Sequence, residues 1–199
     1  VGEVVMGNAR QAGGGPNVAR QISVRAGIPE TTPAWTVNMA CGSGLKALAL
    51  AVESVQLGRC DLAVGGGTES MSGLPFFLPK MRRGYRLGHA PLVDAMYQDG
   101  FQCPLANMLM GATAEKLAKL REISRAEQDR FALASQQKAA AAQAAGRFAD
   151  EIAPLELVTK KETVRFATDE HVRGDTTMES LAKLPPVFKK DGRVTAGNA

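Results

Sequence analysis

One cysteine of this chain lies in a setting that could make it a nucleophile. Cys41 follows residues 34–39 (AWTVNM), which are rich in β-forming side chains, and it precedes the tripeptide GSG and an apolar pattern of helical spacing over residues 45–57. A thiol at the start of a helix meets free backbone N–H groups and the positive end of the helix dipole, which favour the thiolate. The same N–H groups could hold an oxyanion as a tetrahedral intermediate forms, and the glycines allow a ligand to approach closely. The segment therefore predicts a nucleophilic cysteine in a strand–turn–helix arrangement, similar to the nucleophile elbow of serine hydrolases.

The other two cysteines lack this setting. Cys60 precedes a predicted strand that has no glycine turn of this kind, and we interpret it as a packing residue; Cys103 lies beside Pro104 in an irregular stretch. Three widely spaced cysteines without a CxxC pair favour neither a zinc site nor a disulfide framework, which fits a reducing compartment. A single cysteine beside glycines is usually an inert buried residue, so the sequence CGSG alone supports both interpretations of Cys41 about equally.

The composition is that of a globular protein without a strong charge bias. The chain has 199 residues, of which 45% are hydrophobic and 22% charged, and its formal net charge is +4. This charge suits anionic small molecules such as phosphates and does not require a nucleic acid. No apolar run reaches the roughly 18 residues of a membrane helix, and no signal peptide is evident. We expect neither a membrane nor a nucleic-acid partner.

The order of the predicted elements favours an α/β fold. Strands that alternate with helices indicate layers packed around a parallel or mixed sheet. Residues 71–104 then contain four prolines and four glycines, and we interpret them as a long irregular excursion of the kind that is often functional. The sequence predicts strands at 1–6, 34–39, 62–64, 153–158 and 163–166, and helices at 18–26, 45–57, 110–120, 178–182 and, from the capping box SRAE, 124–145.

Several segments resemble the thiolase family, in order and in spacing. The segment NMACGSGLKAL and the segment GGGTESMS carry most of the resemblance, and AGGGPNVARQ, MGATAEKLAK, SRAEQDRFALASQQKAAAAQ, GRFADEI and the terminal VTAGNA agree with it. Together they cover essentially the whole chain. The resemblance implies a thiolase-like layered α/β/α fold, here an incomplete N-terminal half with a large α+β insertion. Residues 1–70 would form a partial N-terminal core that carries Cys41, and residues 71–199 a CoA-binding loop domain.

The resemblance also implies a chemistry. Cys41 matches the nucleophile of acetyl-CoA C-acyltransferases, which takes an acyl group from a CoA thioester and passes it on in a ping-pong reaction. One direction is thiolysis of a 3-ketoacyl-CoA, and the other is condensation of acetyl-CoA. Coenzyme A enters as a thioester substrate, and neither a cofactor nor a metal is implied. A homodimer or homotetramer is expected, with the cytoplasm as the default location and an organelle as the alternative.

Four further residues match family positions near coenzyme A. Arg173, in the stretch DEHVRGD, matches a position that meets the CoA nucleotide, and a guanidinium suits a phosphate. Ser180 and Ala196 match positions that line the CoA channel, and Met110 matches a methionine near the reactive sulfur. Without the resemblance, Arg173 would be a solvated surface residue and Met110 core filler. Leu109 stands where some members have a histidine, so the pantetheine contact of that histidine is not expected, and the biosynthetic acetoacetyl-CoA subclass is not indicated.

The family places further catalytic groups in a second half. That half supplies an asparagine, a Gly-His-Pro histidine and a cysteine in a Cys-x-Gly-Gly-Gly motif, which act as oxyanion donor, as base for Cys41 and as acid–base for the condensing carbon. The two histidines of this chain, His89 and His171, match none of these roles. The resemblance therefore predicts that these residues alone are catalytically incomplete and expose an apolar surface that the second half would cover.

Two other functions stay open. A ketoacyl synthase of the same superfamily also uses a cysteine at a strand-to-helix turn, but it condenses malonyl groups with decarboxylation; the tripeptide GSG and the long insertion favour a thiolase. The other alternative is a thiolase-derived module that binds CoA or lipid without catalysis. An intact Cys41 at a helix start argues against it, because binding alone does not need a thiolate.

Overall fold

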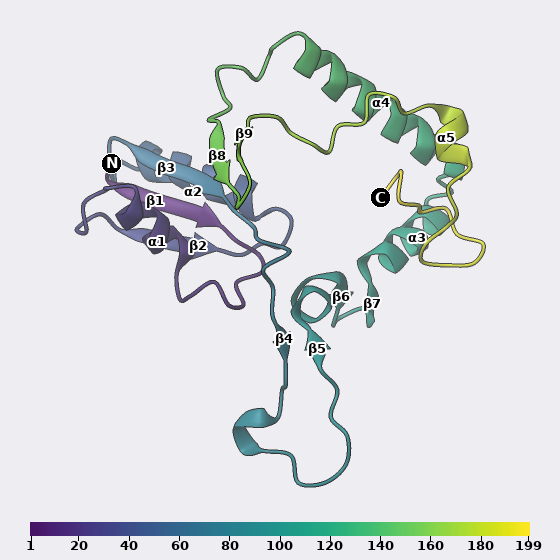
Figure 1. Ribbon diagram of the computed structural model, residues 1–199, viewed down its shortest axis with the longest axis horizontal. Coiled ribbons are helices and arrows are strands. Elements are labelled where there is room, and N and C mark those ends of the chain that lie inside the picture. Colours follow the sequence, from purple (N-terminus) through teal and green to yellow (C-terminus); the bar gives the residue numbers. More distant parts are fainter. The chain divides into compact units, whose positions relative to one another are not determined.

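The computed structural model describes all residues, 1–199, and they form two compact units (Figure 1). Unit 1 is Val1–Asn107 and unit 2 is Met108–Ala199. The irregular excursion of residues 71–104 belongs to the first unit. The functional division after residue 70, into a thiolase core and a CoA-binding loop domain, stays a prediction.

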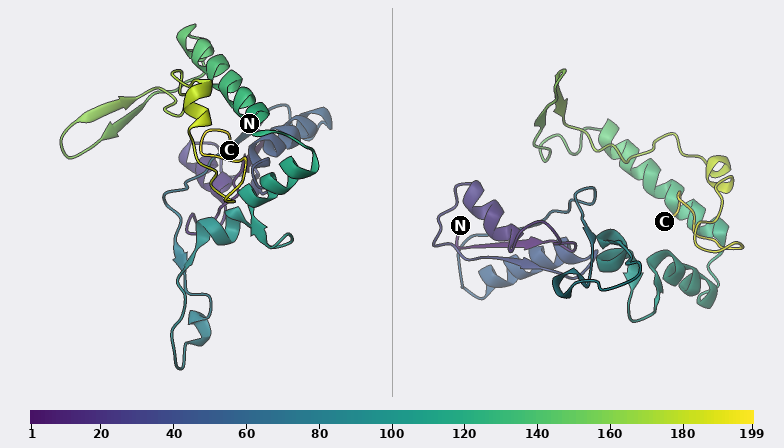
Figure 2. Two further views of the ribbon diagram at one scale, coloured as in Figure 1. Left: turned by 90° about the vertical axis from the view of Figure 1, so that its right-hand side faces the viewer. Right: turned by 60° about the horizontal axis from the view of Figure 1, so that its bottom comes forward.

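The centre of unit 1 is a parallel sheet of three strands in the order β2-β1-β3. Helices α1 and α2 connect the strands and lie on opposite faces of the sheet (Figure 2). A central strand covered on both faces buries consecutive residues, since neighbouring side chains point to opposite faces. Val4 and Val5 of β1 are accordingly 1% and 0% exposed. The elements are β1 (Glu3–Gly7), α1 (Val18–Arg25), β2 (Ala34–Val37), α2 (Ser43–Gln56) and β3 (Ala63–Gly67).

Asn17 fixes the start of α1 and ties it to the sheet. Its side-chain oxygen accepts a hydrogen bond from the N–H of Arg20 at 3.1 Å, as an N-cap residue does. Its amide nitrogen donates to the carbonyl of Ala34 in β2 at 3.0 Å. The predicted helix is therefore confirmed, with its start set by a local signal.

Small side chains let α2 lie close to the sheet. Ala47, Ala51 and Ser54 are buried on its inner face, and a Cβ on Gly65 of β3 would lie 3.0 Å from the Cβ of Ala51. The opposite face of α2 is apolar and open. Its exposed large apolar residues are Leu45, Leu48, Val52 and Val55, between 41% and 74% exposed.

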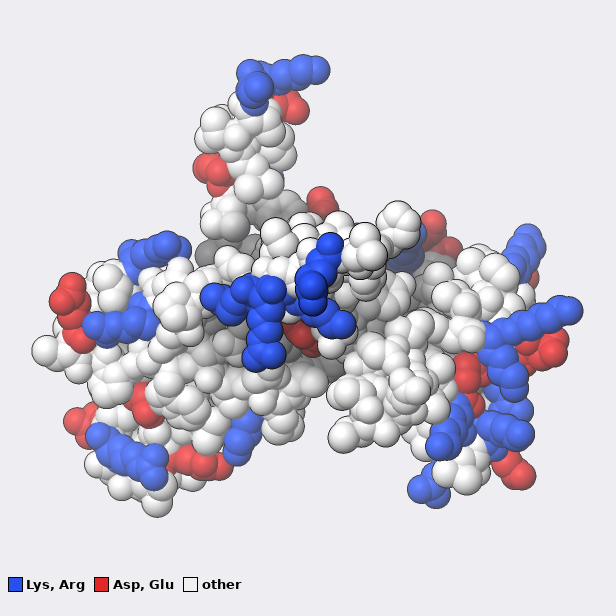
Figure 3. Space-filling view, turned by 90° about the horizontal axis from the view of Figure 1, so that it is seen from below, with Lys and Arg blue, Asp and Glu red and all other residues white.

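The excursion in unit 1 has little regular structure. The strands β4 (Phe76–Phe77) and β5 (Val93–Asp94) pair antiparallel and enclose a basic tip. Between Glu69 and Asp94 the sequence has four lysines and arginines and no acidic residue. Figure 3 looks onto this tip and shows the blue side chains gathered there. The remaining elements are η1 (Met81–Arg83), the π-helical η2 (Tyr97–Phe101) and β6 (Gln102–Cys103).

Unit 2 is built mainly from helices. The capping box predicted at the start of α4 is confirmed: the Ser124 hydroxyl accepts from the N–H of Glu127 at 3.2 Å, and the Glu127 carboxylate accepts from the N–H of Ser124 at 2.7 Å. Hydrogen bonds from the Ser124 hydroxyl and then from its N–H lower the pKa of Glu127 below its usual value. The elements are β7 (Met108–Leu109), α3 (Met110–Leu120), α4 (Arg125–Ala144), the antiparallel pair β8 (Leu155–Val158) and β9 (Thr163–Phe166), and α5 (Met178–Ala182).

None of the helices combines the length and the apolar character that crossing a lipid bilayer would require.

Candidate active site

Cys41 lies in the connection between β2 and α2, at the edge of the sheet where the strands have their carboxyl ends. The residue is exposed. The predicted strand–turn–helix arrangement is confirmed, although the strand ends two residues earlier than expected and α2 begins two residues earlier. Open α/β sheets bind their ligands at this edge, so Cys41 is placed where a reactive group is useful.

The turn before Cys41 is strained and is held from inside by Ser43. Ala40 has a φ of +48°, a left-handed conformation that costs a residue with a Cβ about 1–2 kcal/mol. Ser43 is only 4% exposed. Its hydroxyl accepts from the N–H of Met39 at 2.9 Å and donates to the carbonyl of Ala40 at 2.6 Å. Ser43 therefore closes the turn around the strained residue that immediately precedes Cys41.

The turn itself uses two of the N–H groups at the start of α2. Those of Gly42 and Ser43 donate to the carbonyls of Met39 and Ala40, each at 3.1 Å. The N–H groups of Cys41, Gly44 and Leu45 have no acceptor among residues 1–199. Only an N–H group without another acceptor can donate a hydrogen bond to an oxyanion. These three groups are therefore the candidates for the predicted oxyanion site.

Two glycines allow α2 to start this close to the sheet. A Cβ on Gly7, the last residue of β1, would lie 2.5 Å from the nitrogen of Gly44. A Cβ on Gly67, the last residue of β3, would lie 3.2 Å from the Cα of Gly44. Real Cβ atoms do not approach backbone so closely, so the absence of a side chain at Gly7 is what permits this packing.

Glu69 joins the ends of β1 and β3 beside this turn. One carboxylate oxygen accepts from the N–H of Ala9 at 2.9 Å, and the other accepts from the N–H of Arg10 at 2.9 Å and from the amide of Asn8 at 3.1 Å. Asn8 is 8% exposed and also donates to the carbonyl of Thr68 at 2.7 Å. The segments that follow the two strands are thus held together by one carboxylate.

The glycine-rich segment and the segment after β3 line one small cleft. The cleft has a volume of about 230 Å³ and is lined by residues within 8–18 and 68–74. The motifs AGGGPN and GTES, which the sequence places far apart, therefore meet at this cleft. Cys41 is not among its lining residues.

The other cysteines and the histidines have different surroundings. Cys60 and Cys103 are half-buried, and the sulfur of Cys103 accepts from the N–H of Ala106 at 3.3 Å. His89 and His171 are exposed, and no side chain of residues 1–199 forms a hydrogen bond with the thiol of Cys41.

Ser180, one of the predicted CoA-channel residues, belongs to the capping box of α5 in unit 2. The N–H of Ser180 donates to the Thr177 hydroxyl at 3.1 Å, and the Ser180 hydroxyl accepts from the N–H of Thr177 at 3.0 Å. The adjacent carboxyl has a lowered pKa, because the backbone N–H of Glu179 itself and then the Thr177 hydroxyl donate to it. Ser180 thus has a structural role at the start of the helix in addition to its predicted one.

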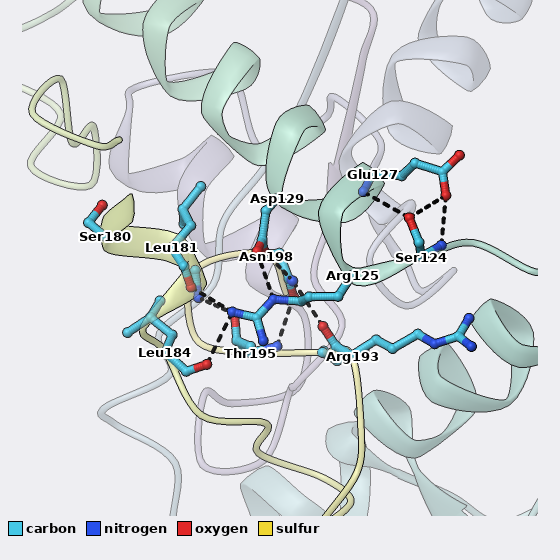
Figure 4. Close-up of polar contacts among 12 residues, drawn as sticks. Ser124, Arg125, Glu127, Asp129, Ser180, Leu181, Leu184, Arg193, Thr195 and Asn198 are labelled. Carbon is cyan, nitrogen blue, oxygen red and sulfur yellow. Dashed lines mark hydrogen bonds and ion pairs between the residues drawn. The ribbon is translucent and has the colours of Figure 1, made fainter. Parts of the chain in front are cut away.

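A network of polar side chains ties two segments of unit 2 to α4 (Figure 4). Asp129 is 2% exposed and accepts from the Nε of Arg125 at 2.7 Å and from the amide of Asn198 at 2.8 Å. Arg125 also donates to the carbonyls of Leu181 at 2.5 Å and Leu184 at 3.1 Å. The network therefore anchors α5, which carries Ser180.

The same network anchors the segment that carries Ala196. The side chain of Asn198 accepts from the N–H of Thr195 at 2.8 Å and donates to the carbonyl of Arg193 at 3.0 Å. Thr195 is fully buried, whereas Ala196 is exposed. Ala196 is therefore an exposed residue on a turn whose backbone is held by the hydrogen bonds of Asn198.

The remaining two predicted residues also lie in unit 2. The backbone of Arg173 is held by Gln136 of α4, whose side-chain oxygen accepts from its N–H at 2.8 Å, and by Thr176, whose hydroxyl donates to its carbonyl at 2.8 Å. Its guanidinium is exposed and makes no ion pair among residues 1–199. Met110 is the first residue of α3 and is 41% exposed.

Comparison with known proteins decides the family. The family model for the thiolase N-terminal domain matches residues 1–199. The chain belongs to the thiolase family. It is 50% identical over 200 residues to an acetyl-CoA acetyltransferase of Pseudomonas aeruginosa, and 47% identical over 200 residues to a probable acetyl-CoA acyltransferase of Staphylococcus epidermidis. Each alignment covers 100% of this chain and 51% of the relative.

A solved thiolase structure supports the same assignment. The crystal structure of the Bacillus anthracis acetyl-CoA acetyltransferase matches with a TM-score of 0.93 at 41% sequence identity, and the match covers 100% of this chain and 50% of that one. The predicted thiolase-like α/β fold is therefore confirmed. The chain spans about half the length of the curated relatives that it matches.

Within this thiolase chain, the predicted site residues are divided between the units. Cys41 lies in unit 1, and Met110, Arg173, Ser180 and Ala196 lie in unit 2. The network around Asp129 joins the segments of Ser180 and Ala196, and a contact ties Arg173 to the same helix, α4. Their roles toward coenzyme A, and the role of Cys41, stay predictions.

Sequence reasoning missed the residues that hold these positions. Ser43 and Glu69 stand inside the motifs CGSG and GGGTES, and Asp129 and Arg125 stand inside the motif SRAEQD. A possible signal was present only for the last pair, because an arginine and an aspartate four residues apart on a helix face each other.

Proposed function

We propose that this chain is the nucleophile-bearing half of a thiolase, which transfers acyl groups between CoA thioesters through an acyl group on Cys41. The sulfur of Cys41 attacks the carbonyl carbon of the first thioester, and the bond to the CoA sulfur breaks, so that CoA leaves as a thiol after taking a proton. In thiolysis, the thiol of a second CoA then attacks the acyl group and releases Cys41. In condensation, the α-carbon of acetyl-CoA attacks instead, after losing a proton to a base.

The observation that carries this proposal is the position of Cys41. The residue is exposed, lies at the carboxyl edge of a parallel sheet, and follows a strained turn that Ser43 closes. The free N–H groups of Gly44 and Leu45 at the start of α2 can donate hydrogen bonds to a developing oxyanion. Two relatives named acetyl-CoA acetyltransferase match this chain along its whole length, and they support the same chemistry.

The proposal assigns the base and the condensing acid–base group to residues of a second thiolase half. Two observations support this assignment. Neither His89 nor His171 forms a hydrogen bond with Cys41. The outer face of α2 presents Leu45, Leu48 and Val52 to solvent, as a surface meant for burial would.

Coenzyme A binding is assigned to unit 2. We propose that the Arg173 guanidinium meets CoA phosphate, that Ser180 and Ala196 line the channel for the rest of the molecule, and that Met110 packs near the reacting sulfur. The fixed backbone around Arg173 and Ala196 supports this assignment, because a pre-organised site loses less entropy on binding. The homo-oligomeric assembly and the cytoplasmic location stay predictions.

The test is to trap the acyl group. The complete gene product that contains this chain is incubated with acetyl-CoA, quenched in acid and digested with trypsin. The three cysteines fall in separate tryptic peptides, residues 26–46 for Cys41, 60–80 for Cys60 and 87–116 for Cys103. We expect acetylation of the first peptide only, and none after Cys41→Ala.

Two outcomes would contradict the proposal. Acetylation of the peptides of Cys60 or Cys103 at equal rates would indicate nonspecific thiol chemistry. An unmodified Cys41, together with CoA affinity that Cys41→Ala does not change, would favour the binding module without catalysis. Use of malonyl-CoA in place of acetyl-CoA as the extending substrate would favour a ketoacyl synthase.

A further inference from the structure

The side chain of Asn38 connects the Cys41 turn to a neighbouring segment of the sheet edge. Its oxygen accepts a hydrogen bond from the N–H of Ala40 at 3.0 Å. Its nitrogen donates to the carbonyl of Ala9 at 3.0 Å. One amide group therefore holds a residue of the turn and a residue that follows β1.

Glu69 holds the far end of this connection. Its carboxylate accepts from the N–H groups of Ala9 and Arg10, each at 2.9 Å. The peptide groups on both sides of Ala9 are thus fixed: Glu69 accepts from the N–H of each, and Asn38 donates to the carbonyl of the second. A continuous chain of hydrogen bonds runs from the Glu69 carboxylate through Ala9 and Asn38 to the N–H of Ala40.

The chain ends at the point where the backbone most needs support. Ala40 has a φ of +48°, which a residue with a Cβ keeps only where its surroundings hold it there. A single peptide group separates the Cα of Ala40 from that of Cys41, so the conformation of Ala40 sets the direction in which Cys41 leaves the turn. Ser43 holds the carbonyl side of Ala40, and Asn38 holds its N–H side.

We propose that Asn38 is a positioning residue for Cys41, and that Glu69 acts through it by fixing the segment after β1. The proposal rests on the proposed function, in which Cys41 is the acylated nucleophile. Only an amide side chain of this length supplies both the acceptor for Ala40 and the donor for Ala9; an aspartate lacks the donor and an alanine lacks both. The hydrogen bonds of the Ser43 hydroxyl to Met39 and Ala40 do not involve Asn38. When Asn38 is replaced, the turn can therefore still form, and only the orientation of Ala40 and Cys41 should change.

The test compares Asn38→Ala and Glu69→Gln with the control Asn17→Ala in the complete gene product. Asn17 also accepts from a backbone N–H and donates to a backbone carbonyl within unit 1, but its partners are Arg20 in α1 and Ala34 in β2, and it accepts a further hydrogen bond from the hydroxyl of Thr36 in β2 at 2.9 Å. The control therefore removes a similar set of hydrogen bonds without touching the turn. Acetylation of Cys41 is followed as a function of acetyl-CoA concentration, and alkylation of the same peptide by iodoacetamide is followed in parallel.

We expect Asn38→Ala to lower the maximal rate of acetylation about 10-fold or more, because a small misplacement of a reacting group costs this much or more. The acetyl-CoA concentration at half-maximal rate should stay unchanged, because Asn38 is not proposed to touch CoA. Iodoacetamide is small and approaches a thiol from many directions, so its rate should change much less. Glu69→Gln should give a weaker effect of the same kind, and Asn17→Ala should lower the melting temperature without changing either rate.

Three outcomes would overturn the inference. Acetylation by Asn38→Ala at the wild-type rate is the first. An equal fall of acetylation and alkylation, matched by Asn17→Ala, would show a general loss of structure and is the second. If the wild type is not acetylated on Cys41, the proposed function fails, and hydrogen exchange of the Ala40 amide then tests the inference separately. Faster exchange in Asn38→Ala but not in Asn17→Ala would support the inference. Equal exchange in the two variants is the third outcome that overturns it.

Discussion

Arg125 and Asp129, four residues apart on α4, form an ion pair that also holds two other segments of unit 2. The Nε of Arg125 lies 2.7 Å from the carboxylate of Asp129, whose side chain is only 3% exposed. Arg125 binds the end of α5 through the carbonyl of Leu181, and Asp129 binds the turn of residues 193–199 through Asn198. One pair on one helix therefore positions the segments that carry two proposed CoA-channel residues.

Asp129→Asn should destabilise unit 2 by about 3 kcal/mol. Removing one partner of a buried pair leaves the other charge without compensation, and such changes typically cost 3–5 kcal/mol. Part of the Arg125 side chain is accessible, with 25% exposure, so the lower figure is the better expectation. The measurement is the free energy of unfolding in urea.

The matched control is Glu127→Gln on the same turn of α4. Glu127 is an exposed member of the capping box, and a glutamine at this position can still accept the hydrogen bond from the N–H of Ser124, so its loss of stability should be much smaller. A loss for Asp129→Asn no larger than for Glu127→Gln would show that the buried pair does not hold the two segments.

Arg173→Gln should weaken binding of CoA about 10-fold, which matches the loss of one hydrogen bond between charged groups. The backbone of Arg173 is held by Gln136 and Thr176, so the substitution should remove the guanidinium and leave the loop in place. Calorimetric titration with CoA and with dephospho-CoA measures the effect, and a smaller loss for dephospho-CoA would assign the 3′-phosphate to Arg173. The control is Arg147→Gln, another exposed arginine of unit 2; an equal loss there would indicate only a general effect of charge.

Stability in acid should depend on Glu3. Its pKa lies below the ordinary value of 4.5, first because Ser54 donates a hydrogen bond to the carboxylate and then because the indole N–H of Trp35 donates at 2.9 Å. A lowered folded-state pKa means that the folded state binds a proton less readily than the unfolded chain. The stabilisation by Glu3 is therefore complete above the unfolded-state pKa and is lost as the pH falls through the folded-state pKa.

The check is the melting temperature of the wild type and of Glu3→Gln from pH 7 downward. We expect Glu3→Gln to melt at a lower temperature near neutral pH, and the difference to shrink below about pH 4.5. Glu53→Gln is the control, since Glu53 is exposed and its side chain accepts no hydrogen bond from residues 1–199. A constant difference between wild type and Glu3→Gln at every pH would contradict the assignment.

The sequence predicted the elements whose signals are local. The capping box of Ser124 and Glu127, the helix after Asn17 and the turn at Cys41 all depend on residues within a few positions of each other, and all three are present. The family resemblance depended on such segments too. Short-range hydrogen bonding and periodicity are visible in a sequence because their partners are neighbours.

The supports of the candidate site were not predicted, because their partners are far apart in the chain. Asn38 reaches Ala9 across 29 positions, and Arg125 reaches Leu181 across 56. The left-handed conformation of Ala40 was also missed, since alanine has no preference for it and only the surrounding hydrogen bonds impose it. Residues of this kind are identified by the tertiary structure, which brings the ends of β1, β2 and β3 to one edge.

Gly7→Ala should disturb Cys41 although the two residues are far apart in the sequence. A Cβ at this position would lie 2.5 Å from the nitrogen of Gly44, so β1 and the start of α2 must separate. Overpacking of this kind costs about 1–3 kcal/mol, and the shift falls on the N–H groups beside Cys41. We expect a lower melting temperature together with slower acetylation of Cys41. Gly14→Ala is the control, because a Cβ there would meet only the carbonyl oxygen of Gln11, at 3.4 Å; wild-type acetylation by Gly7→Ala would show that the close approach of β1 to α2 does not set the position of the thiol.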